Sequence, residues 1–133
     1  MTATWILGPC SMESRSLYFE VGEYLATLMQ GRDWYYKASF DKANRSTIGA
    51  ARGPGLHAGI ALFRDFKAQF PEVRLATDIH ECHQAEVLAS CIDCIQVPAF
   101  LCRQTDLLVE CGRCFDKINI KKGQWVSPSN ILG

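Results

Sequence analysis

The sequence of this chain predicts a parallel α/β fold, because three of its features are typical of that class. Short apolar runs alternate with amphipathic stretches along the 133 residues, as strands alternate with helices. The connections between these segments are short with one exception, and no repeat or low-complexity tract interrupts the pattern. Hydrophobic residues make up 48% of the chain, so the elements can bury a packed core.

About five strands are expected, each an apolar or aromatic run that is bounded by Gly, Pro or polar residues. These runs span residues 5–8, 34–40, 73–77, 92–97 and 117–121. The segment 41–55, which follows the second run, is polar, rich in glycine and long for a plain connection. Long ordered loops of this kind are usually functional.

Helices are expected between the strands, because apolar residues recur at the 3–4 spacing of one helix face. The first such face carries Leu17, Val21, Tyr24, Leu25 and Leu28. The second carries Leu56, Ile60, Phe63, Lys67 (through its aliphatic stem) and Phe70. We also expect a short helix over 82–90 and a helix capped by Thr105 over Leu107 and Leu108.

About five parallel strands with intervening helices correspond to half of a TIM barrel rather than to a finished open sheet. A parallel sheet needs both faces covered and its edges protected, which five strands alone do not achieve. We therefore expect residues 1–133 to form one domain, the N-terminal half of a barrel that ends before the remaining strands.

The charge and the N-terminal sequence exclude several functional classes. Lys+Arg and Asp+Glu both number 14, so no net field attracts nucleic acid or an anionic membrane. No basic region with a following apolar run marks a signal peptide, and no apolar stretch reaches the ~20 residues that span a bilayer. We expect a cytoplasmic protein whose seven cysteines are free thiols.

The alternation of side chains along the strands brings polar residues to one face. In a barrel strand, alternate side chains point to the interior and to the helices. Two interior faces are expected to be polar: Tyr35, Lys37 and Ser39 on the second strand, and Lys117, Asn119 and Lys121 on the fifth. Ile118 and Ile120 should then face the helices, and Gln96 should share a face with Ile92 and Cys94.

Several cations fall at or just beyond the carboxyl ends of the predicted strands, where barrel enzymes keep their sites: Lys37, Lys42, Arg45 and Lys121. A buried lysine can have a purely structural role if it pairs with a carboxylate such as Asp78. Convergence of several cations without a matching run of acids instead favours an anionic ligand. Phosphate and carboxylate groups are the natural candidates.

Five segments resemble the 3-deoxy-D-manno-octulosonate 8-phosphate synthase family, in that family's order and spacing: Gly8-Pro9-Cys10, and residues 37–46, 77–81, 96–106 and 119–124. The resemblance implies a TIM barrel and a homotetramer. It also implies condensation of phosphoenolpyruvate with arabinose 5-phosphate and water, which yields the sugar acid of lipopolysaccharide and phosphate.

The resemblance also implies a role for each matching residue. The catalytic residues would be Lys42, Asn44, Asp78 and Lys121. The phosphoenolpyruvate site would contain Lys37, Lys42, Gln96, Ala99 and Lys121. The arabinose 5-phosphate site would contain Asn44, Arg45, Ser46 and Asp78, with Arg45 and Ser46 able to reach the site of a neighbouring subunit.

A lone cysteine at the end of a strand is more often a small buried residue than a ligand. The resemblance instead implies the metal-dependent type of the family, which has Cys at the position of Cys10, whereas the metal-independent type has Asn. A thiolate with His and carboxylate partners suits Zn, Fe, Mn or Co. The partners that the resemblance implies come from later strands, beyond the 133 residues. We therefore expect this chain alone to be inactive and not to hold the metal stably.

A competing metal site is suggested by two C-x-x-C pairs, Cys91/Cys94 and Cys111/Cys114. Zinc sites place such pairs on turns, whereas Cys91 and Cys94 fall on a predicted strand, where residues three apart point to opposite faces. His80 and His83 are spaced as possible ligands, but His80 belongs to a segment that the family resemblance already explains.

Two other functions stay open from the sequence. One is the sister synthase that uses erythrose 4-phosphate, although its loop typically carries Lys-Pro-Arg-Thr where this chain has Lys42-Ala43-Asn44-Arg45-Ser46. The other is a protein without catalysis, either a half-barrel that binds partners or a zinc-binding module.

Overall fold

The structure is a computed structural model, and it describes residues 3–132. One sheet contains five parallel strands in the order β1-β2-β3-β4-β5. The strands are β1 (Trp5–Ser11), β2 (Trp34–Ser39), β3 (Leu75–Asp78), β4 (Cys94–Val97) and β5 (Ile118–Ile120). The helices are α1 (Arg15–Leu28), α2 (Leu56–Gln69), α3 (Gln84–Ala89) and α4 (Thr105–Cys114), with 3-10 turns η1 (Ala99–Leu101) and η2 (Pro128–Leu132).

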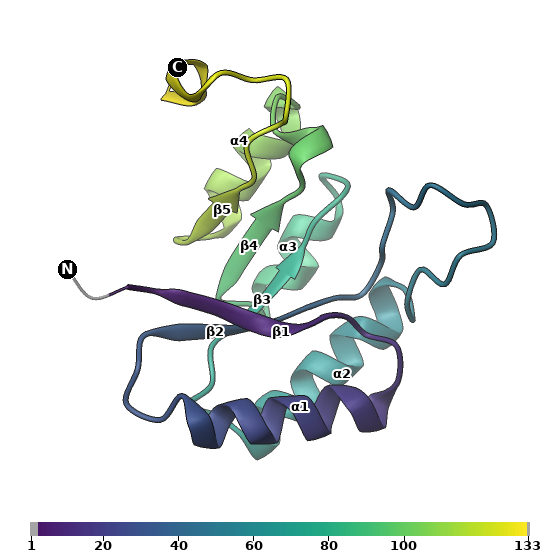
Figure 1. The fold of residues 1–133 in the computed structure, drawn as a ribbon, viewed down its shortest axis with the longest axis vertical. Helices are drawn as coiled ribbons and strands as arrows, with labels where there is room; N and C mark the ends of the chain where they lie inside the picture. Colours follow the sequence, from purple (N-terminus) through teal and green to yellow (C-terminus); the bar gives the residue numbers. More distant parts are fainter. Residues whose placement is uncertain (1–2, 133) are drawn as a thin grey trace.

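A helix follows each of the first four strands, and the four helices cover one side of the twisted sheet (Figure 1). Each strand pairs in parallel with the next one along the chain, so each connecting helix joins two neighbouring strands. This is the arrangement of part of a TIM barrel, so the predicted fold class is confirmed. Among the described residues, no helix is long and apolar enough to cross a membrane.

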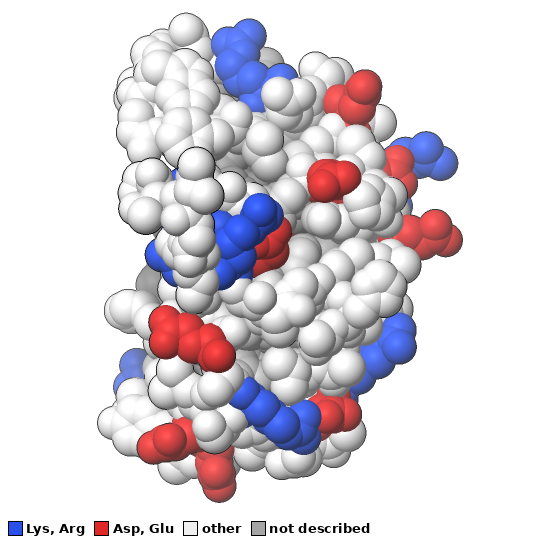
Figure 2. Space-filling model, turned by 90° about the vertical axis from the view of Figure 1, so that its right-hand side faces the viewer, with Lys and Arg blue, Asp and Glu red and all other residues white. Residues whose placement is uncertain are grey.

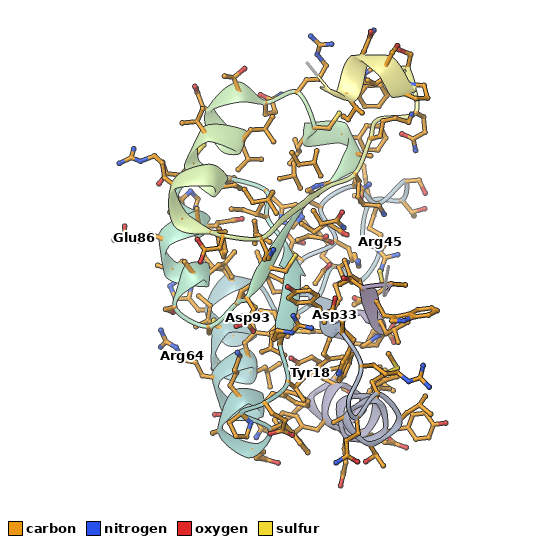
Figure 3. The ribbon with its side chains drawn as sticks, turned by 90° about the vertical axis from the view of Figure 1, so that its left-hand side faces the viewer. Tyr18, Asp33, Arg45, Arg64, Glu86 and Asp93 are labelled. Atoms are coloured by element: carbon orange, nitrogen blue, oxygen red, sulfur yellow. The ribbon has the colours of Figure 1, made fainter. Side chains whose placement is uncertain are left out.

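The main core lies between the helices and the outer face of the sheet. Tyr36, on β2, is fully buried there and stacks on Tyr18 of α1 (labelled in Figure 3), with ring centroids 5.0 Å apart. The Tyr36 hydroxyl donates a hydrogen bond to the backbone oxygen of Tyr18 at 2.5 Å, so the buried ring keeps its polar atom satisfied. Phe63 and Phe66 of α2 complete this aromatic cluster.

The buried face of α1 matches the predicted one in part. Val21 and Leu25 pack against the core, as predicted. Leu17, Tyr24 and Leu28 share the predicted face, but all three are exposed. Tyr18 and Gly22 are the fully buried positions instead. Spacing alone therefore predicted the helix and part of its buried face, but not the two residues that pack most closely.

Gly22 allows this close packing, because a Cβ atom there would lie 2.3 Å from the Phe66 ring. We expect Gly22→Ala to destabilise the protein by about 1–3 kcal/mol through overpacking. The matched control is Gly112→Ala in α4, where no atom lies within 4 Å of the added Cβ. That variant should be neutral or stabilised by up to about 1 kcal/mol. Urea unfolding of both proteins measures the difference, and equal effects would contradict the packing argument.

Several predicted boundaries also shift. β1 continues through Gly8-Pro9-Cys10, beyond the predicted end at Gly8, and its register against β2 shifts between Leu7 and Cys10. Gly8 permits this, because a Cβ atom there would lie 2.0 Å from the backbone oxygen of Lys37. The first strand therefore carries Cys10 up to the end of β2.

Smaller differences affect the later elements. The fourth strand begins at Cys94, so Ile92 lies in the helix-side core rather than on the face of Gln96. The helix α4 is preceded by Gln104, and Thr105 is its first residue instead of its cap. Ile118 and Ile120 lie opposite the Asn119 face, as predicted, but both are more than a third exposed. The helix layer covers this last strand incompletely.

Candidate active site at the carboxyl ends of the strands

A cavity of about 440 Å³ lies at the carboxyl ends of the strands, where the sequence predicts the site. Its lining includes these predicted residues: Cys10, Lys37, Lys42, Asn44, Asp78, Gln96, Ala99 and Lys121. The structure therefore brings together side chains from the first four strands and from the connections that follow the strands, including Lys121 just after β5. Arg45 and Ser46 do not line this cavity.

Asp78, the last residue of β3, is the centre of the buried part of the site. Lys37 Nζ lies 3.1 Å from its carboxylate, and Lys42 Nζ lies 3.7 Å away. The opposite carboxylate oxygen accepts a hydrogen bond from the amide of Gln96. Strand register produces these contacts. Asp78 is aligned with Gln96 on β4, and Lys37 on β2 is aligned with Ala76, whose side chain lies on the same face of β3 as that of Asp78.

The surroundings of Asp78 keep it ionised. Burial alone would raise the pKa of its carboxyl group, since a charged carboxylate loses hydration there. The charge of Lys37 and hydrogen bonds from Ser39 and Gln96 outweigh burial, and the pKa of Asp78 lies below its ordinary value. One carboxylate is shared by two ammonium groups, so it does not neutralise both. The thiolate of Cys10, which both lysines also contact, or a ligand anion can supply the second negative charge.

Ser39 and Asn119 are site residues that the sequence prediction did not assign. The Ser39 hydroxyl accepts hydrogen bonds from Lys37 at 3.1 Å and Lys42 at 3.0 Å and donates one to Asp78. Asn119, on β5, donates to the Gln96 side-chain oxygen at 2.8 Å. Both had been placed on the interior faces of their strands, so this alternation was the signal that identified them.

Cys10 is held in an unusual backbone conformation beside the two lysines. Its φ of 69° lies in the left-handed region, which is uncommon for a residue other than glycine and often marks a functional position. Lys42 Nζ lies 3.0 Å from the Cys10 sulfur, and Lys37 Nζ lies 3.8 Å from it. The register shift in β1 therefore directs this exposed thiol into the cavity.

The lysines also favour the thiolate form of Cys10. Partial burial acts to raise the pKa of the thiol, but the Lys42 hydrogen bond and the charges of Lys37 and Lys42 outweigh it. The pKa of Cys10 is therefore lowered. A thiolate is the form that acts as a nucleophile or a metal ligand.

Lys121, Ala99 and Asn44 complete the cavity from the connections after the strands. The backbone N–H of Lys121 donates to the Val97 oxygen at 3.0 Å, which fixes the chain just beyond β5. The Lys121 side chain is exposed and forms no ion pair within the described part of the chain. It is thus a cation at the cavity that is available to a ligand.

The anion site is a local feature rather than part of a large basic surface. On the face that Figure 2 shows, basic and acidic side chains occur in small interspersed groups on a mostly uncharged surface. This distribution agrees with the zero net charge of the chain. Attraction of a small anion must therefore depend on the few lysines that line the cavity.

Arg45 and Ser46 lie on the long loop between β2 and α2, away from the main cavity. Arg45 lines a second cavity of about 400 Å³ together with Ser14 and Arg15 at the start of α1 (Figure 3). Ser46 is exposed. Within one chain, the predicted arabinose 5-phosphate residues are therefore divided, with Asn44 and Asp78 at the main cavity.

The two C-x-x-C pairs do not form a common centre. Cys91 packs in the core on the helix side of the sheet, whereas Cys94 packs with Tyr35 and Ala76 in a small cluster on the other face. Burial raises the pKa of both thiols, which disfavours the thiolate that zinc requires. Within residues 3–132 there is no group of three or more side chains that could hold a metal ion.

Known proteins with similar sequences share one name. A relative from Campylobacter jejuni is 47% identical, and the match covers 95% of this chain and 47% of the relative. Relatives from Helicobacter hepaticus (48% identical, 93% and 46% covered) and Bartonella tribocorum (45% identical, 99% and 49% covered) are similar. All three carry the name 2-dehydro-3-deoxyphosphooctonate aldolase.

The chain spans about half the length of the curated relatives that it matches. A sequence model described as the DAHP synthetase I family matches residues 2–133. The matched residues include all five strands, the helices between them and every residue that lines the main cavity. The chain therefore belongs to the DAHP synthetase I family.

Proposed function

We propose that the whole protein condenses phosphoenolpyruvate with arabinose 5-phosphate and water to form 3-deoxy-D-manno-octulosonate 8-phosphate and phosphate. The observation that carries this proposal is the convergence of Lys37, Lys42 and Lys121 on one cavity. The relatives' shared name supports the choice of product. We propose a cytoplasmic role in lipopolysaccharide biosynthesis, as the resemblance implies.

The cavity offers the contacts that this reaction needs. In the proposed reaction, the enol carbon of phosphoenolpyruvate forms a bond with the aldehyde carbon of the pentose, water adds to the neighbouring carbon, and phosphate leaves. Lys37, Lys42 and Lys121 would hold the carboxylate and phosphate of phosphoenolpyruvate, with Gln96 and Ala99 beside them. Fixed cations stabilise developing negative charge without reorganisation, and positioning of the two reacting carbons lowers the barrier.

Arabinose 5-phosphate would lie against Asn44 and Asp78, with its hydroxyl groups near the carboxylate. Arg45 and Ser46 lie outside the main cavity of their own chain, so we propose that they contact the pentose phosphate in a neighbouring subunit. A homotetramer, as in the resemblance, would bring them there. Both proposals depend on the exposure of the loop that carries these residues.

The test is an assay of phosphate release by the purified whole protein. We expect release that depends on both phosphoenolpyruvate and arabinose 5-phosphate, with kcat/KM at least about tenfold higher than for erythrose 4-phosphate. The second candidate is the erythrose 4-phosphate synthase, which the description of the matching family favours. A preference for erythrose 4-phosphate would establish that candidate, and no release with either sugar would support a non-catalytic role.

We propose that Cys10 supplies one ligand to a divalent metal, Zn, Fe, Mn or Co, in the whole protein. The Cys10 side chain lines the cavity, and the pKa of its thiol is lowered, so it suits this role. Within residues 3–132 Cys10 belongs to no group of three candidate ligands, so we propose that its partner ligands come from the remainder of the whole protein. Such a metal acts as a Lewis acid that polarises a bound oxygen.

Removal of the metal is therefore expected to abolish most of the phosphate release. A chelator should inactivate the whole protein, and addition of Mn or Zn should restore it. Metal analysis before and after chelation shows whether the ion was removed. Full activity of a protein with no measurable metal would contradict the proposal.

A further inference from the structure

The loop between β2 and α2 is closed at its base by contacts with the chain on both sides. Gly55 donates its backbone N–H to the Phe40 oxygen at 3.0 Å, and Lys42 donates its backbone N–H to the Arg52 oxygen at 2.7 Å. Gly53 passes so close that a Cβ atom would lie 2.6 Å from the Phe40 oxygen. The ends of the loop are therefore fixed, although its outer residues project from the molecule (Figure 1).

The side chain of Arg52 makes a second connection at the same place. Its guanidinium donates two hydrogen bonds to the two carboxylate oxygens of Asp41, at 2.7 and 2.5 Å. This fork-to-fork geometry defines orientation as well as distance, unlike a single contact between charges. The Asp41 side chain is 22% exposed. The Arg52 hydrogen bonds, acting against burial, lower the pKa of Asp41.

We propose that Arg52 is a positioning residue for Lys42. Its backbone oxygen and its guanidinium hold the two residues on either side of one peptide bond, Asp41 and Lys42. Lys42 can then extend its ammonium group to the Cys10 sulfur and the Ser39 hydroxyl, both at 3.0 Å. Arg52 does this from outside the main cavity, because it lines the second cavity beside α1.

A lysine side chain has considerable rotamer freedom, and a fixed backbone reduces the number of directions that it can take. Besides the contacts of the Lys42 ammonium group itself, backbone hydrogen bonds and the Arg52–Asp41 pair hold the base of this loop. Asp41 precedes Lys42 in the chain, and its carboxylate would lose this partner if Arg52 were absent. The bidentate pair therefore anchors the backbone from which the Lys42 side chain extends.

The first test measures the position of Lys42 without any substrate. In the whole protein, acetylation of Lys42 by an N-hydroxysuccinimide ester is quantified by mass spectrometry relative to Lys67. Lys42 is 16% exposed and forms the contacts described above. In Arg52→Ala and in Asp41→Asn, we expect its labelling to rise about fivefold, because the bidentate contact no longer orients the backbone of Lys42, although the Arg52 side chain itself is 59% exposed.

The control is Arg15→Ala. Arg15 forms a single contact with Asp65 at 2.6 Å, and both side chains are at least half exposed. This variant should leave the labelling of Lys42 unchanged. Unchanged labelling in folded Arg52→Ala, or an equal rise in Arg15→Ala, would overturn the proposal.

The second test rests on the proposed function. We expect Arg52→Ala to raise the KM for phosphoenolpyruvate about fivefold with a smaller change in kcat, and Arg52→Lys to recover part of the loss. A fall in thermal stability with unchanged KM would show a purely structural pair and would overturn the proposal. If the protein does not use phosphoenolpyruvate at all, the proposed function fails, while the labelling result still decides the role of Arg52.

Discussion

Lys121→Ala is expected to lower kcat/KM for phosphoenolpyruvate by about 100-fold, as the removal of one preorganised electrostatic contact typically does. Lys121 lines the cavity and forms no ion pair within residues 3–132, so its charge is available to the substrate. Its loss leaves no charged partner unpaired among residues 3–132. Phosphate release gives the activity, and circular dichroism should show an unchanged fold.

Lys117→Ala is the matched control for Lys121→Ala. Lys117 is an exposed lysine just before β5, at the other end of the same strand, and does not line the cavity. It should retain near-normal activity. Near-normal turnover of Lys121→Ala, or an equal loss in both variants, would show that the position of Lys121 at the cavity has no special role.

Asp78→Ala is expected to destabilise the protein by about 3 kcal/mol, because it leaves buried cations without their counterion. Asp78 is only 7% exposed, and it is the carboxylate that Lys37 and Lys42 share. The variant also removes the acceptor of the Gln96 amide. Urea unfolding at neutral pH gives the change in the free energy of unfolding.

The effect of Asp78→Ala should depend on pH. The pKa of Asp78 is lower in the folded protein than the value of about 3.9 in an unfolded chain. Its ionised form therefore stabilises the fold fully above the unfolded value, and this contribution is lost as the pH falls through the lowered value. The difference in stability between wild type and variant should be constant near neutrality and should shrink in acid.

Asp65→Ala is the control that removes the carboxylate of an exposed ion pair instead of the buried carboxylate of Asp78. The Asp65 side chain is 50% exposed and pairs with Arg15 at the surface, so its removal should change stability by less than about 1 kcal/mol. A similar loss of stability in both variants, or an Asp78→Ala protein as stable as wild type, would contradict the view that the buried cations need Asp78.

The candidate site could be predicted as far as strand alternation extends. Lys37 and Ser39 share a face because residues two apart in a strand always do. Parallel pairing then places successive carboxyl ends at one edge of the sheet, which brings Gln96 and Asp78 beside them. The residues of the long loop could not be placed in this way. Side chains in a loop do not alternate with a regular period. The sequence pattern therefore could not predict that Asn44 lines the main cavity and Arg45 the second one.

The same limit explains the differences in α1 and β1. Periodicity in α1 indicated a helix, but its buried face was selected by the fit of Tyr18 and Gly22 against Phe66, which lies 44 positions along the chain from Gly22 (66 − 22). In β1, the sequence Gly-Pro suggested an end to the strand. The close approach of Gly8 to Lys37 instead let the strand continue to Ser11.

By itself, the sequence determined the α/β class, the order of strands and helices, and the residue types that gather at the carboxyl ends, since these depend on local period and chain direction. Only the tertiary structure decided which side chains touch. The left-handed conformation of Cys10 beside β2 and the sharing of Asp78 by two lysines depend on contacts between segments far apart in the chain, and the contact of Arg52 with Asp41 depends on the path of an irregular loop. Such distances are set by packing of whole elements, which no local pattern encodes.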